Sequence, residues 1–300
     1  MESLITYTAC PSCGATPIQK VLSAKDYTVS QRVFEIWECR QCTLRFTQQV
    51  PSAGDIAPYY QSENYISHSD TQRGLVNRLY HMVRRRTLKS KHQLIESATG
   101  KKSGSLLDVG AGTGAFLHQM QQNGWQVTGL EPDATARERA STLYNLQLLP
   151  SDQLWNIPPA SLDAITLWHV LEHVHQLNEY MAQLKKLLKP GGYLFIAVPN
   201  YTSRDANFYG ECWAAWDVPR HLYHFSPEAM KQLVKKHGLQ LKAIRPMWYD
   251  SFYVSLLSEK CKTGRSRLLP GAFAGFMSNW NALWDRERCS SLIYVMSTEA

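Results

Sequence analysis

Residues 105–117, SLLDVGAGTGAFL, decide the fold of this 300-residue chain. The run 105–109 is short and apolar, as is typical of a buried strand, and it leads directly into Gly110-Ala-Gly112-Thr-Gly114. Apolar residues then recur at helical spacing. Glycines let a ligand approach the backbone without a Cβ clash, and a helix begins with unpaired amide donors. The segment therefore predicts a strand, a ligand-binding turn and a helix.

Strands and helices alternate on both sides of this segment. Further strands are expected over 126–130, 146–149, 162–168, 193–198, 240–245 and 290–296. Helical patterns occupy 133–144 and 177–188. This alternation predicts an α/β fold class with a doubly wound, mostly parallel, seven-stranded Rossmann-like sheet. Ligands of such sheets bind beyond the carboxyl ends of the strands, where the strand order reverses, which is where the glycine turn should lie.

Two acidic residues frame the glycine turn and indicate the kind of ligand. Glu131 ends the next strand, where a carboxylate accepts hydrogen bonds from both ribose hydroxyls of a nucleoside. Asp108 lies two residues before a G-x-G-x-G spacing, whereas dinucleotide-binding folds use G-x-G-x-x-G. We therefore expect a nucleoside cofactor. The alternative is a doubly wound domain that binds NAD or no cofactor.

Four motifs in order, LLDVGAGTGAF, GLEPD, SLDAITLWHVLEHV and LKKLLKPGGYLFIAVPN, resemble class I S-adenosylmethionine-dependent methyltransferases over about residues 105–200. The resemblance implies S-adenosylmethionine as cofactor. It implies that the three turn glycines line the methionine end, that Glu131 holds the ribose and that Asp152 contacts the adenine. The cofactor contacts expected in all are Asp108, Gly110, Gly112, Gly114, Glu131, Asp152 and Trp168.

Four cysteines near the start have the spacing of a metal site. Cys10-Pro-Ser-Cys13 and Cys39-Arg-Gln-Cys42 form two C-x2-C pairs, which close a tetrahedral zinc shell with no open position for water. The pattern predicts a structural zinc ion in a ribbon-like module over 1–50, with a β-prone segment over 28–37. Unrelated thiols or a redox pair are the alternative. The spacing does not separate a scaffold from a nucleic-acid reader.

With this N-terminal zinc-ribbon-like module, the chain resembles small-molecule methyltransferases, including deoxysugar C-methyltransferases. The expected acceptor is a hydroxyl or carbon of an anionic or apolar small molecule, such as a sugar, a lipid-linked compound or a polyketide-like compound. Ribosomal RNA guanine methyltransferases with a zinc finger have the same layout, but a net charge of +7 supplies few phosphate contacts. A third reading is a non-catalytic, S-adenosylmethionine-binding interaction protein.

Candidate catalytic groups follow the fourth expected strand. His169, Glu172 and His173 are spaced i, i+3 and i+4, so on a helix they would share one face beside the methyl donor. We favour His173 as a general base with Glu172 as its orienting partner. The same string is similar to an inverted zinc-peptidase motif, and to a divalent-ion site of some quinone-precursor O-methyltransferases. The alternative is that these histidines have a structural role and only cap the helix or pack under the cofactor.

A second candidate segment, residues 213–227, is rich in aromatic residues and is expected to build the acceptor pocket. It holds Arg220, His221 and His224, of which the two histidines are reserve bases. Ser226-Pro227 should begin the next helix as N-cap and first helical residue. The alternative is a surface loop fixed by its aromatic rings.

The remaining segments are assigned as follows. Residues 51–100 are expected to form a linker and a lid helix over 74–98, with a basic cluster on its solvated face comprising Arg84, Arg85, Arg86, Lys89 and Lys91. Residues 101–300 form the methyltransferase domain, with an insertion over 247–288 between the last two strands. The insertion is read as a substrate lid, a helical pair, a dimer contact or a membrane-surface face.

Composition sets the outer limits. Hydrophobic residues make up 44% and charged residues 19%, which excludes a disordered or collagen-like protein. No apolar run reaches the length that crosses a bilayer, and the first residues lack a signal-peptide layout. We therefore expect a cytoplasmic protein without a transmembrane segment.

Overall fold

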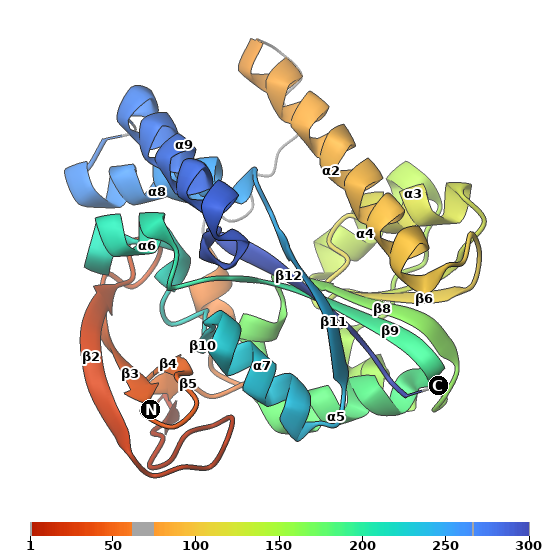
Figure 1. Ribbon diagram of the computed structural model, residues 1–300, viewed down its shortest axis with the longest axis horizontal. Coiled ribbons are helices and arrows are strands. Elements are labelled where there is room, and N and C mark those ends of the chain that lie inside the picture. Colours follow the sequence, from red (N-terminus) through yellow and green to blue (C-terminus); the bar gives the residue numbers. More distant parts are fainter. Residues whose placement is uncertain (1, 62–74, 266, 300) are drawn as a thin grey trace.

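A six-stranded sheet organises the part of the chain that the computed structural model describes, residues 2–61, 75–265 and 267–299. In Figure 1 it runs through the middle of the molecule. Its strands are, from edge to edge, β11 (Gln240–Pro246), β12 (Ser291–Ser297), β9 (Leu188–Pro199), β8 (Leu162–Trp168), β6 (Ser105–Val109) and β7 (Gln126–Leu130). Among these six, β12 alone runs against the others. The predicted mostly parallel α/β sheet is confirmed.

The predicted count of seven strands is wrong for the described residues. Residues 146–149 contribute a single bridge, in which Leu149 pairs with Leu130. The Leu149 amide donates to the Gly129 carbonyl, and the Glu131 amide donates to the Leu149 carbonyl, both over 2.9 Å. Pro150 follows and has no amide hydrogen, so the ladder cannot continue past this point.

Helices cover both faces of the sheet (Figure 1). One face carries α2 (Leu75–Thr99), α3 (Ala115–Gln122) and α4 (Ala134–Tyr144), and the other carries α5 (Leu177–Leu187) and α7 (Pro227–Lys236). Residues 62–69 of the predicted linker lie outside the described residues, as do the side chains of 75–81. Ser226 caps α7 by accepting from the Ala229 amide, and Pro227 follows it, as predicted. Both faces of the central strands are therefore buried, which explains their continuous apolar sequences.

The N-terminal segment forms a second, antiparallel sheet of four strands. In order these are β10 (Tyr223–His224), β4 (Arg45–Thr47), β3 (Val33–Cys39) and β2 (Ile18–Lys25). A further small pair joins β1 (Leu4–Ile5) to β5 (Val50–Pro51). Because β10 comes from the segment after β9, the N-terminal sheet is completed by residues that are far away in sequence.

The β-prone stretch over 28–37 becomes a strand only from Val33. Its first residues form a turn around the Asp26 carboxylate, which accepts hydrogen bonds from the amides of Thr28, Val29 and Ser30. Asp26 is buried, so these bonds replace the water that the carboxylate loses on folding.

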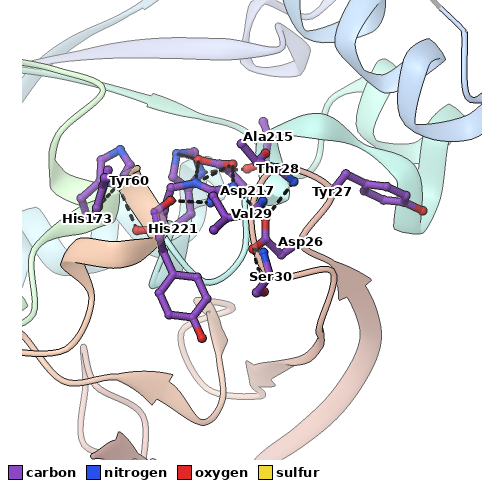
Figure 2. A network of polar contacts seen from close by, with 12 residues as sticks. Asp26, Tyr27, Thr28, Val29, Ser30, Tyr60, His173, Ala215, Asp217 and His221 are labelled. Carbon is purple, nitrogen blue, oxygen red and sulfur yellow. Dashed lines mark hydrogen bonds and ion pairs between the residues drawn. The ribbon is translucent and has the colours of Figure 1, made fainter. Parts of the chain in front are cut away.

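Arg220 joins the N-terminal sheet to the central domain. Its side chain is 1% exposed and contacts Asp26 of the turn at 3.2 Å and Asp217 at 2.5 Å. It also donates to the Tyr59 carbonyl over 2.9 Å. Figure 2 shows the turn residues around Asp26 on one side of this network and His173 and His221 on the other. A buried guanidinium paired on all sides thus fixes the relative position of the two parts.

Two helices, α8 (Asp250–Thr263) and α9 (Leu268–Trp284), lie between β11 and β12. They pack against each other and against α6 (Arg204–Tyr209), at the top left of Figure 1. Across the described ranges, no helix is both long enough and apolar enough to span a bilayer.

Arg220→Met should lower the free energy of unfolding by about 3–5 kcal/mol, because it leaves the buried Asp26 carboxylate and the partly exposed Asp217 carboxylate without their cation. Urea unfolding followed by circular dichroism measures this change. Lys231→Met is the control, since its bridge to Glu287 is 40% exposed on both sides and such pairs contribute about 0–1 kcal/mol. Equal, small effects of both substitutions would contradict the role given to Arg220.

Candidate functional site

The glycine turn lies at the carboxyl end of β6, between β7 and β8, where the strand order reverses. Gly110, Gly112 and Gly114 all have positive φ, at 71°, 55° and 79°. A Cβ on Gly110 would lie 2.5 Å from Val170 Cγ2, so this position excludes side chains. A Cβ on Gly112 would meet nothing within 4 Å, so this glycine borders open space. The turn therefore provides a bare backbone surface toward a ligand.

Glu131 closes the other side of this surface. The carboxylate accepts from the Gly112 amide over 2.8 Å and from the Asp133 amide over 3.0 Å. Burial raises the pKa of Glu131, and these two amide bonds oppose that effect. A buried carboxylate next to an open glycine backbone matches the ribose hydroxyls and polar chain of a nucleoside cofactor. The residues present therefore fit the cofactor implied by the sequence.

Asp108, which is buried, and Lys91, which is partly buried, influence each other electrostatically beside the turn. Burial raises the pKa of Asp108 to about 7, although Thr166 donates to its carboxylate over 2.6 Å. Burial lowers the pKa of Lys91 to about 8, although the negative charges of Asp108 and Asp250 act to raise it. Each group thus faces an opposite charge in a site with little water.

The prediction that Lys91 lies on a solvated face is wrong. Its ammonium sits 4.1 Å from the centre of the Trp168 ring. The signal was present in the sequence, because Lys91 falls three residues after Leu88 and four before Ile95, within the apolar stripe of α2. Arg85, Arg86 and Lys89 of the same cluster are exposed.

The remaining expected cofactor residues, Trp168 and Asp152, lie in different surroundings. Trp168 ends β8 and packs edge-on against Phe116, with the ring centres 5.6 Å apart. Its buried indole nitrogen has no hydrogen-bond partner among the described residues. Asp152 is exposed in the short helix η2 (Ser151–Asn156), which follows the bridge beside Glu131.

The prediction that His169, Glu172 and His173 share a helix face is wrong. His169 has a φ of 59°, and the helix η3 covers only Leu171–His173. Instead of lying on a helix, His169 places its ring between two carboxylates, 2.8 Å from Asp250 of α8 and 3.4 Å from Glu172. Burial alone would lower the pKa of His169, but these two carboxylates raise it to about 10. His169 is thus a cation at neutral pH and is not available as a base.

His173 and His221 face each other across the site, with ring centres 4.6 Å apart. His173 Nδ1 lies 2.9 Å from the Arg220 carbonyl, and His221 Nδ1 lies 2.9 Å from the Ala215 carbonyl. A carbonyl only accepts, so each Nδ1 carries the proton and each Nε2 has a free lone pair. Burial and the neighbouring His221 lower the pKa of His173 to about 4. Both the fixed tautomer and the low pKa keep His173 neutral.

Glu172 lies next to these two rings and is fully buried. Neither of its carboxylate oxygens has a hydrogen-bond partner in the described part of the chain. One ligand atom from each of Glu172, His173 and His221 lies within 4.8 Å of the others. This buried carboxylate pairs with His169 at 3.4 Å and lies beside two further imidazoles, so it can stabilise a positive charge on a protonated imidazole or on a divalent cation.

His224, the last reserve base, lies at the edge of this cluster. It belongs to β10, its Nε2 is 3.0 Å from Thr47 Oγ1, and its ring packs edge-on against Trp216. Burial lowers its pKa well below the usual histidine range. His224 therefore links β10 to β4 within the N-terminal sheet, and its ring centre lies 6.5 Å from that of His221, at the edge of the cluster.

Two contacts in the site had no signal in the sequence. Asp250 reaches His169 from the insertion, and the Tyr60 hydroxyl lies 3.1 Å from His173 Nδ1 (Figure 2). Each comes from a segment more than 80 residues from its partner, so no local spacing predicts it.

The four N-terminal cysteines form the second cluster of ligands. Cys10 Sγ lies 3.5 Å from Cys42 Sγ, and Cys13 Sγ lies 3.6 Å from Cys39 Sγ. All four sulfurs lie within 4.8 Å of one another, and none is in a disulfide. Tetrahedral Zn–S bonds of about 2.3 Å place sulfurs about 3.8 Å apart, so the cluster fits a small zinc site.

Sequence comparison identifies relatives of the central domain. A ubiquinone biosynthesis O-methyltransferase of Nitrosococcus oceani is 29% identical over 167 residues, which cover 51% of this chain and 70% of the relative. The corresponding protein of Leptothrix cholodnii is 26% identical over 171 residues, covering 52% of this chain and 73% of the relative.

Solved structures share the fold. A 1,6-didemethyltoxoflavin-N1-methyltransferase from Burkholderia thailandensis superposes with a TM-score of 0.51 at 14% identity, covering 92% of this chain and all of that one. A methyltransferase from Thermotoga maritima gives 0.50 at 18% identity, covering 75% and 96%.

The family model described as "Methyltransferase domain" matches residues 80–244, which is more than half of the chain. This range contains the glycine turn, Glu131 and the Glu172 cluster. The chain therefore belongs to the S-adenosylmethionine-dependent class I methyltransferases.

Proposed function

We propose that this enzyme methylates a hydroxyl or an acidic carbon of a small-molecule acceptor, with a histidine of the Glu172 cluster as general base. The observation that carries the proposal is the fully buried Glu172 carboxylate, which pairs with His169 at 3.4 Å and lies beside the imidazoles of His173 and His221. Val170, two residues before Glu172, contacts the turn at Gly110 and so ties this cluster to the cofactor loop. The O-methyltransferase names of the relatives agree with a hydroxyl acceptor.

The cofactor is held by the backbone of the glycine turn and by Glu131, with Trp168 and Asp152 as further contacts. S-adenosylmethionine supplies an electrophilic methyl group when bound. Asp108 and Lys91 lie beside the turn and would balance the charges of the amino acid end. The main task of the protein is to align donor and acceptor and exclude water.

The acceptor proton is assigned to Nε2 of His173. The bond from the acceptor oxygen or carbon to the methyl group forms as the methyl–sulfur bond breaks, and the acceptor proton moves to the imidazole. Hydrogen bonding to the Arg220 carbonyl keeps His173 in the required tautomer. Glu172 then stabilises the imidazolium. His221, whose Nδ1 also donates to a backbone carbonyl, that of Ala215, is the reserve base.

The four-cysteine cluster is proposed to bind one structural zinc ion. Four thiolates close the shell, so the ion has no position for a substrate. Its role is to fix the two turns at Cys10–Cys13 and Cys39–Cys42, and therefore the end of β3. This places β4 for its pairing with β10, which leads into α7.

The function is tested by methyl transfer into fractionated cell extract. Radiolabel from S-adenosylmethionine should enter the small-molecule or lipid-soluble fraction, and Glu131→Ala should weaken cofactor binding about 10- to 150-fold, because charged hydrogen bonds contribute about 1.5–3 kcal/mol. The exposed Glu138→Ala is the matched control. Label in RNA would overturn the acceptor class, and no label in any fraction would favour a non-catalytic binding protein.

His173→Gln should lower kcat by about 10²–10⁴ while the melting temperature and the Kd for S-adenosylmethionine stay unchanged. Turnover of the acceptor found in the extract experiment measures this. His224→Gln should do the opposite, with a lower melting temperature and normal kcat, because His224 links β10 to β4 through Thr47. A His173→Gln enzyme with normal kcat would transfer the role to His221, tested with His221→Gln.

Elemental analysis of protein purified without chelator should find one zinc ion per chain. Cys39→Ser should lose the ion and melt at a lower temperature, since the thiolates are then uncompensated. Cys212→Ser, a cysteine outside the cluster, should keep both zinc and stability. Wild-type protein without zinc would refute the structural ion.

A further inference from the structure

Helix α9 is built with its bulky residues outward. Its buried side carries only small residues, Gly271, Gly275, Ser278 and Ala282. At Gly275 a Cβ would lie 2.8 Å from Phe252 Cα, so α8 packs directly on this small-residue side. The core therefore uses the narrow side of the helix.

The opposite side forms one apolar stripe with a spacing of three or four residues. We name it the α9 apolar face, and it comprises Leu269, Phe273, Phe276, Trp280, Leu283 and Trp284. These side chains are 50% to 84% exposed. None of the 17 residues of α9 is charged. A stripe of this size on a surface helix indicates a binding surface.

The charges around this face are basic. Lys260 and Lys262 lie in the last turn of α8, and Arg265 and Arg267 lie in the connection to α9. Lys262 lies 4.8 Å from the centre of the Phe208 ring, and Arg267 pairs with Glu259. Lys260 and Arg265 are therefore the basic side chains that a partner is expected to contact. The acidic side chains of residues 250–288 are already paired, with Asp250 bound to His169, Glu259 to Arg267, Asp285 to Arg288 and Glu287 to Lys231. A partner surface that complements this face must therefore be negatively charged.

We propose that the α9 apolar face binds the surface of an anionic phospholipid bilayer, with the helix lying in the plane of the interface. Leucine, phenylalanine and tryptophan side chains enter the boundary between headgroups and acyl chains, and basic side chains stay with the phosphates. A second copy of this chain fits less well. Packing two α9 faces together would bury the stripe, but the copy offers no unpaired acid from residues 250–288 to the basic turn.

This surface adjoins the site through α8, because Asp250 at its first turn holds His169. Lipid binding would thus place the Glu172 cluster close to the bilayer, where an amphiphilic acceptor would be presented. Vesicle binding does not depend on the proposed methyl transfer, so the experiments can contradict one proposal without contradicting the other.

Co-sedimentation with vesicles tests the proposal. Wild-type protein should bind vesicles of phosphatidylcholine with phosphatidylglycerol, and bind much less to pure phosphatidylcholine. Leu283→Asp should reduce the partition coefficient at least tenfold, whereas Leu143→Asp on α4, of similar exposure at 54% against 62%, should not. Lys260→Gln with Arg265→Gln should reduce binding about fivefold per charge, and the control Lys102→Gln should not.

Melting temperatures of all variants confirm that they fold. Equal vesicle binding by Leu283→Asp and Leu143→Asp overturns the proposal. The proposal is also overturned if the wild-type protein does not bind vesicles and sediments as a dimer, and if Leu283→Asp converts that dimer to a monomer. That result would assign the face to a second copy.

Discussion

A single buried cation, the Arg220 guanidinium, holds the two parts of this protein together. It is paired with Asp26 of the N-terminal turn and Asp217 of the segment after β9, and it also binds the Tyr59 carbonyl. The backbone carbonyl of the same residue accepts from His173. One residue therefore determines where the N-terminal sheet sits and which tautomer His173 adopts. A buried charge tolerates little displacement, because each lost partner leaves an uncompensated ion.

Two histidines of the site, His169 and His173, have pKa values shifted in opposite directions although they are only four residues apart. His169, between Asp250 and Glu172, carries a second proton, whereas burial lowers the pKa of His173, which faces His221. Two imidazolium ions beside one carboxylate would repel each other, so proton uptake by one ring opposes uptake by the other. Glu172 has room for one new positive charge, which is what a base requires when it accepts a proton.

Helix α8 connects this electrostatic arrangement to the outer surface. Its first residue fixes His169, its side packs on the glycines of α9, and α9 presents the apolar face. The insertion is thus part of the site at one end and part of the surface at the other. Packing through glycine leaves little freedom between the two helices, since a single added Cβ would clash with the α8 backbone.

The sequence by itself determined the features whose physical cause is local. The glycine turn, the order of strands and helices, the Ser226 cap and the paired cysteines follow from periodicity, conformational freedom and ligand spacing. Tertiary structure decided the rest. It broke the expected helix at His169, whose ring pairs with Asp250, brought His221 to Glu172 and placed β10 in the N-terminal sheet. These outcomes depend on contacts between segments far apart in the chain, where burial of charge and packing outweigh local preference.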